Sequence, residues 1–266
     1  QATDMRYNLY VSAPTTIYIG GIYAIKQDKA KILLINDHGY SNFKNVAYPQ
    51  LKALGIPTTW AINPGRLGES VTDVESILTQ EDIDELAYDP YSEFSMHNWN
   101  PVGNTTANMS ADELLEDTHK CMTYLKKNGI LPRYPWRAAF THNLAPEHAV
   151  LQPYLDAYAT PSDNAGIELY PFRNCYNVNR VALHSSSTDL DRIFEQLQKT
   201  HSLLVCYTHG LDDTGGIHMT NAQLNYFLQK IEEGVSEGWL EGTTFSKLRG
   251  QYGGDYSDWR YYLDIL

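Results

Sequence analysis

Short apolar runs alternate with helical patterns along most of the chain. Continuous apolar runs at 31–36 and 202–207 are typical of strands buried on both faces, and 58–62 and 93–96 also fit strands. Amphipathic or capped segments predict helices at 43–54, 79–87, 110–128, 147–158, 188–200 and 220–233. A further strand is expected over 136–140, and a strand and turn over 243–248.

This alternation predicts an α/β fold with a parallel sheet. About seven strand and helix units favour a closed barrel over an open doubly wound sheet. Residues 8–24 are rich in Tyr, Val, Thr and Ile, which predicts short strands ahead of the main fold. We therefore divide the chain into an N-terminal β extension at 1–28 and a barrel domain at 29–266.

Composition narrows the classes of partner. The 266 residues include 20 basic and 32 acidic side chains, a formal net charge of −12, which argues against nucleic acid or an anionic membrane as main partner. No apolar run approaches the ~20 residues that cross a bilayer, and the first residues lack a signal-peptide pattern. Three cysteines, Cys121, Cys175 and Cys206, have no metal-binding spacing. Buried thiols are the simpler interpretation, with one disulfide left open.

Chemically active residues follow the buried strands. Asp37 and His38 come after the first apolar run, His97 after the 93–96 strand and His209 after the late run, while Arg137 lies in a strand pattern. Because parallel strands end at one face of a barrel, we expect these side chains to lie together. One Asp, three His and one Arg suit a divalent metal with acid and base groups.

Each of these residues also has a structural interpretation. Asp37 and His38 are common residue types in a turn before glycine. The structural alternative for His97 is an imidazole packed among its neighbours, and for His209 it is a hydrogen bond to its own loop. Glycoside hydrolysis ranks low, because it needs paired carboxylates at strand ends and only Asp37 stands out. Three aromatic residues either line a sugar-binding groove or belong to the core: Tyr40, Trp99 and Trp136.

Four segments form an ordered series over residues 30–250: Ile35-Asn-Asp-His-Gly-Tyr-Ser41, Gly55-Ile-Pro-Thr-Thr-Trp60, Ser95-Met-His97 and Leu203-Leu-Val-Cys-Tyr-Thr-His209. The first looks like the Thr-Phe-Asp-Asp-Gly-Tyr-Ser motif of the polysaccharide deacetylases, carbohydrate esterase family 4 with its NodB homology domain. The others resemble that family's next segment, the start of its His-Ser/Thr-x-x-His motif and its late histidine segment. The resemblance implies a distorted (β/α) barrel, one divalent metal ion and hydrolysis of N-acetyl or O-acetyl groups on a polysaccharide.

The resemblance also implies catalytic roles for three residues. Asp37 falls on the family's general base, and His209 falls on the catalytic acid that protonates the leaving group. Arg137 resembles the arginine that orients the catalytic Asp through a charge-paired hydrogen bond, with Arg133 as the other candidate. The family's Asp-x-x-Asp-Trp segment is absent, although Asp163 lies in the corresponding region.

The metal ligands implied by the resemblance depart from the family pattern. His38 falls on the second Asp of the first motif, and His97 falls on the first His ligand. The second His ligand would fall at Pro101, which cannot bind a metal, so Asn100 or water is expected to complete the site. Further candidates are Asn98 and His142. Imidazole ligands favour Zn²⁺, with Co²⁺ or Ni²⁺ as alternatives.

We therefore expect a metal-dependent hydrolase that deacetylates a polysaccharide with an Asp base and a His acid. The alternative is a non-catalytic carbohydrate-binding barrel that has lost a complete metal site. A third hypothesis is hydrolysis of a C–N bond in a small amide at the same rim. The resemblance further implies a secreted, cell-envelope or virion-associated location.

Overall fold

Seven parallel strands pair side by side in a ring that closes between β1 and β10. In the computed structural model, the described residues are 28–72, 75–99, 109–130, 136–138, 150–155, 157–161, 167–168, 176–185, 188–212 and 217–252. Around the ring the strands are β1 (Ala30–His38), β2 (Thr58–Ile62), β5 (Ser92–Met96), β6 (Trp136–Arg137), β7 (Ala157–Pro161), β9 (Val178–Ala182) and β10 (Leu203–Thr208). The expected α/β barrel of about seven parallel strands is confirmed.

The other strands lie at the margins of the barrel. They are β8 (Ile167–Glu168), which pairs antiparallel with β10, β11 (Leu240–Gly242), which pairs parallel with β1, and the hairpin of β3 (Ser70–Thr72) and β4 (Glu75–Ser76). β1 therefore has β10 along one edge, and β11 and β2 in succession along the other. The N-terminal β extension expected at 1–28 lies outside the described residues, apart from residue 28.

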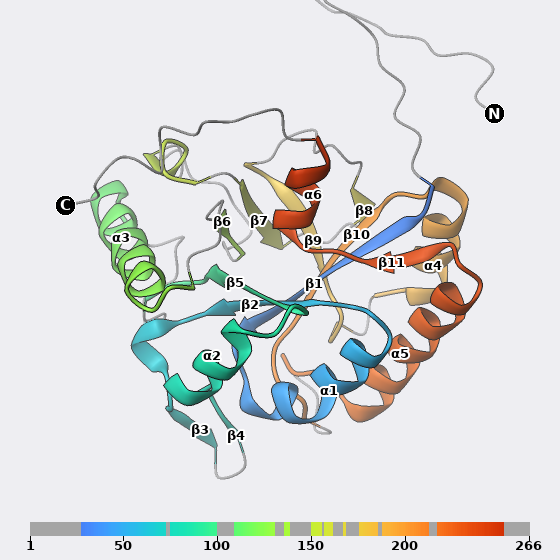
Figure 1. Cartoon of the computed structure of the whole chain (residues 1–266), viewed down its shortest axis with the longest axis horizontal. Coiled ribbons are helices and arrows are strands. Elements are labelled where there is room, and N and C mark those ends of the chain that lie inside the picture. Colours follow the sequence, from blue (N-terminus) through green and yellow to red (C-terminus); the bar gives the residue numbers. More distant parts are fainter. Residues whose placement is uncertain are drawn as a thin grey trace, which may run out of the picture.

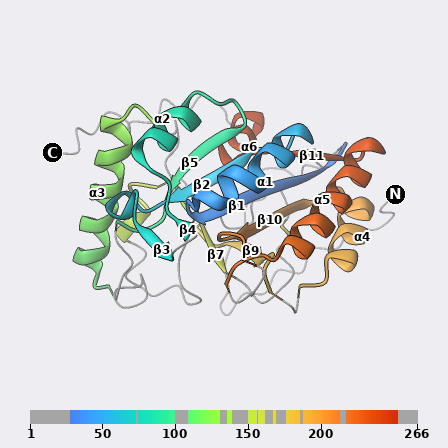
Figure 2. The same ribbon diagram turned by 90° about the horizontal axis from the view of Figure 1, so that it is seen from below.

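Helices surround the barrel, with α3 on the side opposite α4 and α5 (Figure 1 and Figure 2). They are α1 (Ser41–Ala53), α2 (Gln80–Ala87), α3 (Ala111–Lys127), α4 (Leu190–Thr200), α5 (Asn221–Ser236) and α6 (Phe245–Tyr252), with a 3-10 turn, η1 (Pro64–Arg66). A capping box of Ser110 and Glu113 begins α3, at the start of the helix expected over 110–128. None of the helices in the described ranges is both long and apolar enough to cross a bilayer.

The barrel separates two apolar cores. Because successive side chains of a strand point to opposite faces, β1 sends Leu33 and Ile35 into the barrel and Ile32 and Leu34 out toward the helices. Cys121 and Cys206 are buried free thiols of the outer core, as expected, and Cys175 lies outside the described residues.

Helix α6 closes the amino-terminal end of the barrel. Its Phe245 ring lies 3.8 Å, centroid to centroid, from the ring of Trp136. The Glu93 carboxylate accepts backbone N–H groups of Phe245 at 3.1 Å and Ser246 at 3.0 Å. The strand and turn expected over 243–248 are therefore wrong: the strand is β11, and a helix begins at Phe245, where a distant carboxylate satisfies its first N–H groups.

The helix expected over 147–158 is also wrong. Leu151 and Leu155 have helical spacing and are buried, but Ala157 and Tyr158 belong to β7. Pro153 lacks the N–H that a helix interior requires, which breaks the pattern between the two leucines. Two smaller differences are that β6 ends at Arg137 within the described residues, and that α4 begins at Leu190, after the cap residue Asp189, rather than at residue 188.

Candidate functional site

The carboxyl ends of the barrel strands bring four histidines together. His38 at the end of β1 lies, by ring centroids, 4.3 Å from His97 after β5 and 5.2 Å from His209 after β10. His209 lies 5.2 Å from His184, which follows β9. We call these four residues the imidazole cluster. Three of them were predicted as site residues, and His184 was not.

Asp37 is buried beside the cluster and is paired with Arg180 of β9. Arg180 Nη1 donates to Asp37 Oδ1 at 2.7 Å, and both side chains are 2% exposed. The Arg180 guanidinium also lies 4.1 Å from the centroid of the Tyr207 ring, a cation–π contact. This single charge-assisted hydrogen bond orients the carboxylate, and the arginine that provides it is Arg180 and not the expected Arg137.

Arg137 has another role in the fold. Its Nε donates to the backbone carbonyl of His97 at 2.9 Å, and its Nη2 donates to Asp117 Oδ2 at 2.6 Å. It also contacts Thr118. Arg137 therefore holds the β5–α3 connection, and with it the backbone of His97, against α3. The other candidate, Arg133, lies outside the described residues.

His38 adopts an unusual backbone conformation. Its φ of 69° lies in the left-handed region, and the next residue, Gly39, has a φ of 73°. A residue with a Cβ pays roughly 1–2 kcal/mol for this conformation. Such strain is most often retained at functional sites, because the conformation aims a side chain or a backbone group.

Asn63 fixes the tautomer of His38. Asn63 Nδ2 donates to the carbonyl of Asn98 at 2.6 Å, so its Oδ1, 2.6 Å from His38 Nδ1, is an acceptor. His38 Nδ1 must therefore carry the proton, which leaves the lone pair on Nε2. A hydrogen bond that fixes the tautomer through the other ring nitrogen is typical of metal-binding histidines. Burial lowers the pKa of His38, although the Asp37 charge opposes the shift, so the neutral form is favoured.

His209 and His97 are also held neutral. His209 Nδ1 lies 2.9 Å from the carbonyl of Ile217 and must donate to it, which leaves the lone pair on Nε2. Desolvation, followed by the charge of His38, holds the pKa of His209 and that of His97 well below 6.5. His97 is buried, and its Nδ1 has no hydrogen-bond partner among the described residues.

These features test whether the site suits a metal ion. The donor chemistry fits: His38 offers a free Nε2, and His97 has a buried ring nitrogen without a partner. However, no three His, Cys, Asp or Glu side chains within the described ranges form a metal-binding group. Asn100, the expected further ligand, lies outside those ranges, as do Pro101, His142 and Asp163.

The three aromatic candidates have different surroundings. Trp136 is 1% exposed and packs inside the barrel, so the expectation that it binds a sugar is wrong. Tyr40 is buried edge-on to His38, with ring centroids 5.9 Å apart. Trp99 is half-buried and faces a cavity beside α3. Of the three, Trp99 has the surroundings of a binding residue.

Comparisons with known proteins find solved structures that share this fold. No protein-family model matches the sequence, and no curated protein does. A structure assigned as a polysaccharide deacetylase from Mycobacterium smegmatis has a TM-score of 0.54 at 10% identity, over 86% of this chain and 92% of that one. "T48 deacetylase with substrate" has a TM-score of 0.50 at 10% identity, over 86% and 95%. The expected resemblance to polysaccharide deacetylases is therefore confirmed at the level of the fold.

Proposed function

We propose that this protein is a hydrolase that removes N- or O-acetyl groups from a polysaccharide with the help of one divalent metal ion. The observation that carries the proposal is the buried Asp37–Arg180 pair beside neutral imidazoles at the carboxyl end of the barrel. The shared fold of two deacetylases supports it. We also propose that the protein acts outside the cytoplasm, because acetylated polysaccharides lie in envelopes and secretions.

His38 and His97 would hold the ion. Bound there, Zn²⁺, or alternatively Co²⁺ or Ni²⁺, would polarise the acetyl carbonyl and increase the acidity of water. Asn63 maintains the ligand tautomer of His38, and Arg137 holds the carbonyl of His97. Asn100 remains our candidate for a further ligand.

Asp37 would act as the base and His209 as the acid. Arg180 keeps the Asp37 carboxylate oriented, and the carboxylate accepts a proton as water attacks the acetyl carbon. His209, neutral with a lone pair on Nε2, takes up that proton from Asp37 and passes it to the leaving nitrogen or oxygen. The acyl C–N or C–O bond breaks, the water oxygen remains in acetate, and the sugar retains a free amine or hydroxyl.

Metal binding and acetate release test the proposal together. Chelator-treated protein is titrated with Zn²⁺ by calorimetry, and acetate is assayed on glycol chitin (N-acetyl) and acetylated xylan (O-acetyl). We expect His97→Ala to weaken Zn²⁺ binding at least about tenfold, because losing a ligand costs no less than losing the hydrogen-bond partner of a ligand, and to abolish acetate release. His201→Asn, at the left-handed residue that ends α4, is the matched control and should behave like the wild type.

A non-catalytic carbohydrate-binding barrel remains the alternative function. It is favoured by the lack of three convergent His, Cys, Asp or Glu ligands in the described part of the chain. A protein that binds the glycans, releases no acetate and is unchanged by Asp37→Asn would support this alternative. Acetate release that Asp37→Asn abolishes would exclude it.

A further inference from the structure

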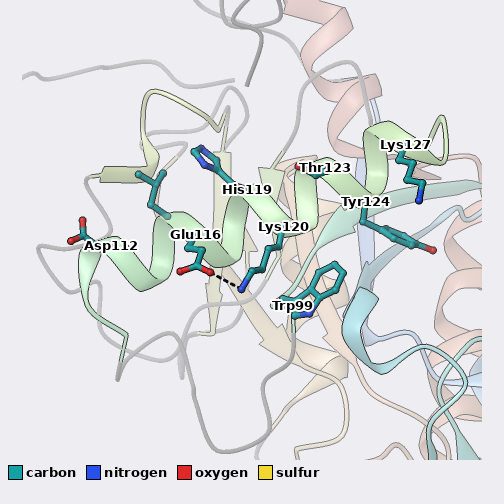
Figure 3. A pocket seen from close by; sticks show the side chains of 9 residues that line it. Trp99, Asp112, Glu116, His119, Lys120, Thr123, Tyr124 and Lys127 are labelled. Carbon is teal, nitrogen blue, oxygen red and sulfur yellow. Dashed lines mark ion pairs between the residues drawn. The ribbon is translucent and has the colours of Figure 1, made fainter. Parts of the chain in front are cut away.

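A groove runs along one face of α3. Its volume is about 600 Å³, within the usual range for ligand sites. Figure 3 shows Trp99 on one side of the groove and a stripe of α3 side chains on the other. The lining residues are Trp99, Asp112, Leu115, Glu116, His119, Lys120, Thr123, Tyr124 and Lys127. From Asp112 to Lys127 the stripe spans about 22 Å, at 1.5 Å per residue, so the groove suits an extended ligand.

The floor of the groove is apolar and aromatic. Trp99, Leu115 and Tyr124 are each half-buried, so each packs on the outer core and still presents a surface to the groove. The Tyr124 hydroxyl donates to Gln80 Oε1 at 2.8 Å, which fixes the ring against α2. Two fixed aromatic rings provide flat apolar faces, and such rings bind ligands at a low cost in conformational entropy.

The charges along the groove balance. Asp112 and Glu116 contribute two acidic groups, and Lys120 and Lys127 contribute two basic ones. Lys120 Nζ lies 2.7 Å from Glu116 Oε1, so one pair is already internally neutralised. A groove with no net charge, an apolar floor and polar edges matches a neutral ligand that has apolar faces and hydroxyl groups around them. A sugar polymer has this chemistry.

Trp99 connects the groove to the imidazole cluster. It follows His97 by two residues, so their α-carbons are at most about 7.6 Å apart. Its backbone N–H donates to Asp117 Oδ1 at 2.8 Å. The indole rests on Gly65, where an added Cβ would lie 2.8 Å from Nε1. The groove therefore passes beside the loop that positions His97.

We propose that the groove along α3 binds further sugar units of the polysaccharide whose acetyl group is presented to the imidazole cluster. The inference rests on the proposed function for the identity of the polymer. Trp99 and Tyr124 stack on sugar faces, and the polar edge residues of α3 bond the hydroxyls. The protein thereby holds a run of sugars and not one acetylated unit alone.

Affinity electrophoresis in gels that contain glycol chitin or acetylated xylan tests the groove without requiring turnover. Tyr124→Ala removes a ring, and Thr123→Arg fills the groove from an exposed position. We expect each variant to weaken the apparent affinity for the polymer, measured by retardation, about tenfold, as for loss of a residue central to binding. Tyr124→Phe keeps the ring and loses only the hydrogen bond to Gln80, so it should bind more tightly than Tyr124→Ala. Tyr88→Ala, at a residue 89% exposed at the end of α2, is the matched control.

The outcomes separate this inference from the proposed function. Reduced retardation of both groove variants, with unchanged circular dichroism, supports the groove even if no acetate is released. Wild-type retardation of both variants overturns it even if acetate is released, and so does a wild type that neither polymer retards. A concentration-dependent dimer that Thr123→Arg dissociates would also overturn it, in favour of a second copy of the chain.

Discussion

At the scale of single residues, the end of β1 combines two features that cost folding free energy. His38 holds a left-handed backbone, and Asp37 and Arg180 are charged groups removed from water. Burying charges costs several kcal/mol per ion, which the hydrogen bond and mutual attraction of the pair offset only in part. Features that cost stability in this way are typical of functional sites, which supports a functional role for the end of β1.

The buried pair leads to a stability prediction. Arg180→Met should lower the free energy of unfolding by about 3–5 kcal/mol, because it leaves the Asp37 charge buried without a partner. Arg192→Met is the matched control. Its charge lies 4.0 Å from Asp189 with both side chains more than half exposed, so a change below about 1 kcal/mol is expected. Urea denaturation measures both.

A double variant checks the mechanism of that loss. Adding Asp37→Asn to Arg180→Met removes the stranded charge, so the double variant should be less destabilised than the sum of the two single variants. Additive losses would mean that the two charges do not stabilise one another.

The backbone of His38 leads to a second prediction. His38→Gly should be more stable than His38→Ala by about 1–2 kcal/mol, because only glycine adopts the left-handed region without a Cβ clash. Both variants lack the imidazole, so their difference in urea midpoint isolates the backbone. Equal midpoints would show that the left-handed conformation is not retained without the imidazole.

Part of the site could be predicted from sequence. Asp37, His38, His97 and His209 follow recognisable strands, so their gathering at one rim follows from a parallel barrel. Arg180 and His184 belong to the five-residue strand β9 and the turn after it, for which no strand was predicted. The choice of Arg180 over Arg137 depends on contacts 143 residues apart, which no local pattern specifies.

At the scale of elements, the predicted helices have local signals and the missed elements lack them. The helices α2, α3 and α5 each begin with a capping box, which the sequence contains within four residues. In contrast, α6 receives its first hydrogen bonds from Glu93, 152 residues earlier in the chain. Its position under the barrel is a tertiary property, so residues 243–248 gave a misleading strand pattern.

Glu93 is accordingly predicted to anchor α6. Glu93→Ala should leave two N–H groups of α6 without an acceptor, at about 1–3 kcal/mol for each buried group, and should increase hydrogen exchange in residues 245–252. Glu93→Gln retains an acceptor oxygen and should cost less. Glu85→Ala, whose side chain is 69% exposed, is the control. Unchanged exchange in Glu93→Ala would contradict an anchoring role.

At the scale of the whole molecule, the imidazole cluster makes stability depend on pH. Desolvation lowers the pKa of all four members below 6.5, and that of His97 and His209 furthest. The unfolded chain therefore binds more protons than the folded one as the pH falls below about 6.5. Stability is expected to be complete above that pH and to decline with acidification.

Urea unfolding of chelator-treated protein between pH 7.5 and 5.5 measures this decline. Each neutral histidine contributes up to about 1.4 kcal/mol per pH unit below its unfolded pKa. His97→Gln should flatten the profile, and His201→Gln, outside the cluster, should not. A profile for His97→Gln as steep as that of the wild type would contradict a neutral His97 in the fold.

The closure of the ring has a consequence for biosynthesis. β1 is the first strand of the barrel, yet two of its three partners are β10 and β11, and the register joins Lys31 to Leu203 and Ala30 to Leu240. At about 5–20 residues per second, a ribosome needs roughly ten to forty seconds to synthesise the chain between β1 and these late strands. Throughout that interval the β10 edge of an apolar strand has no partner, so aggregation through this edge competes with folding until the last strands are made.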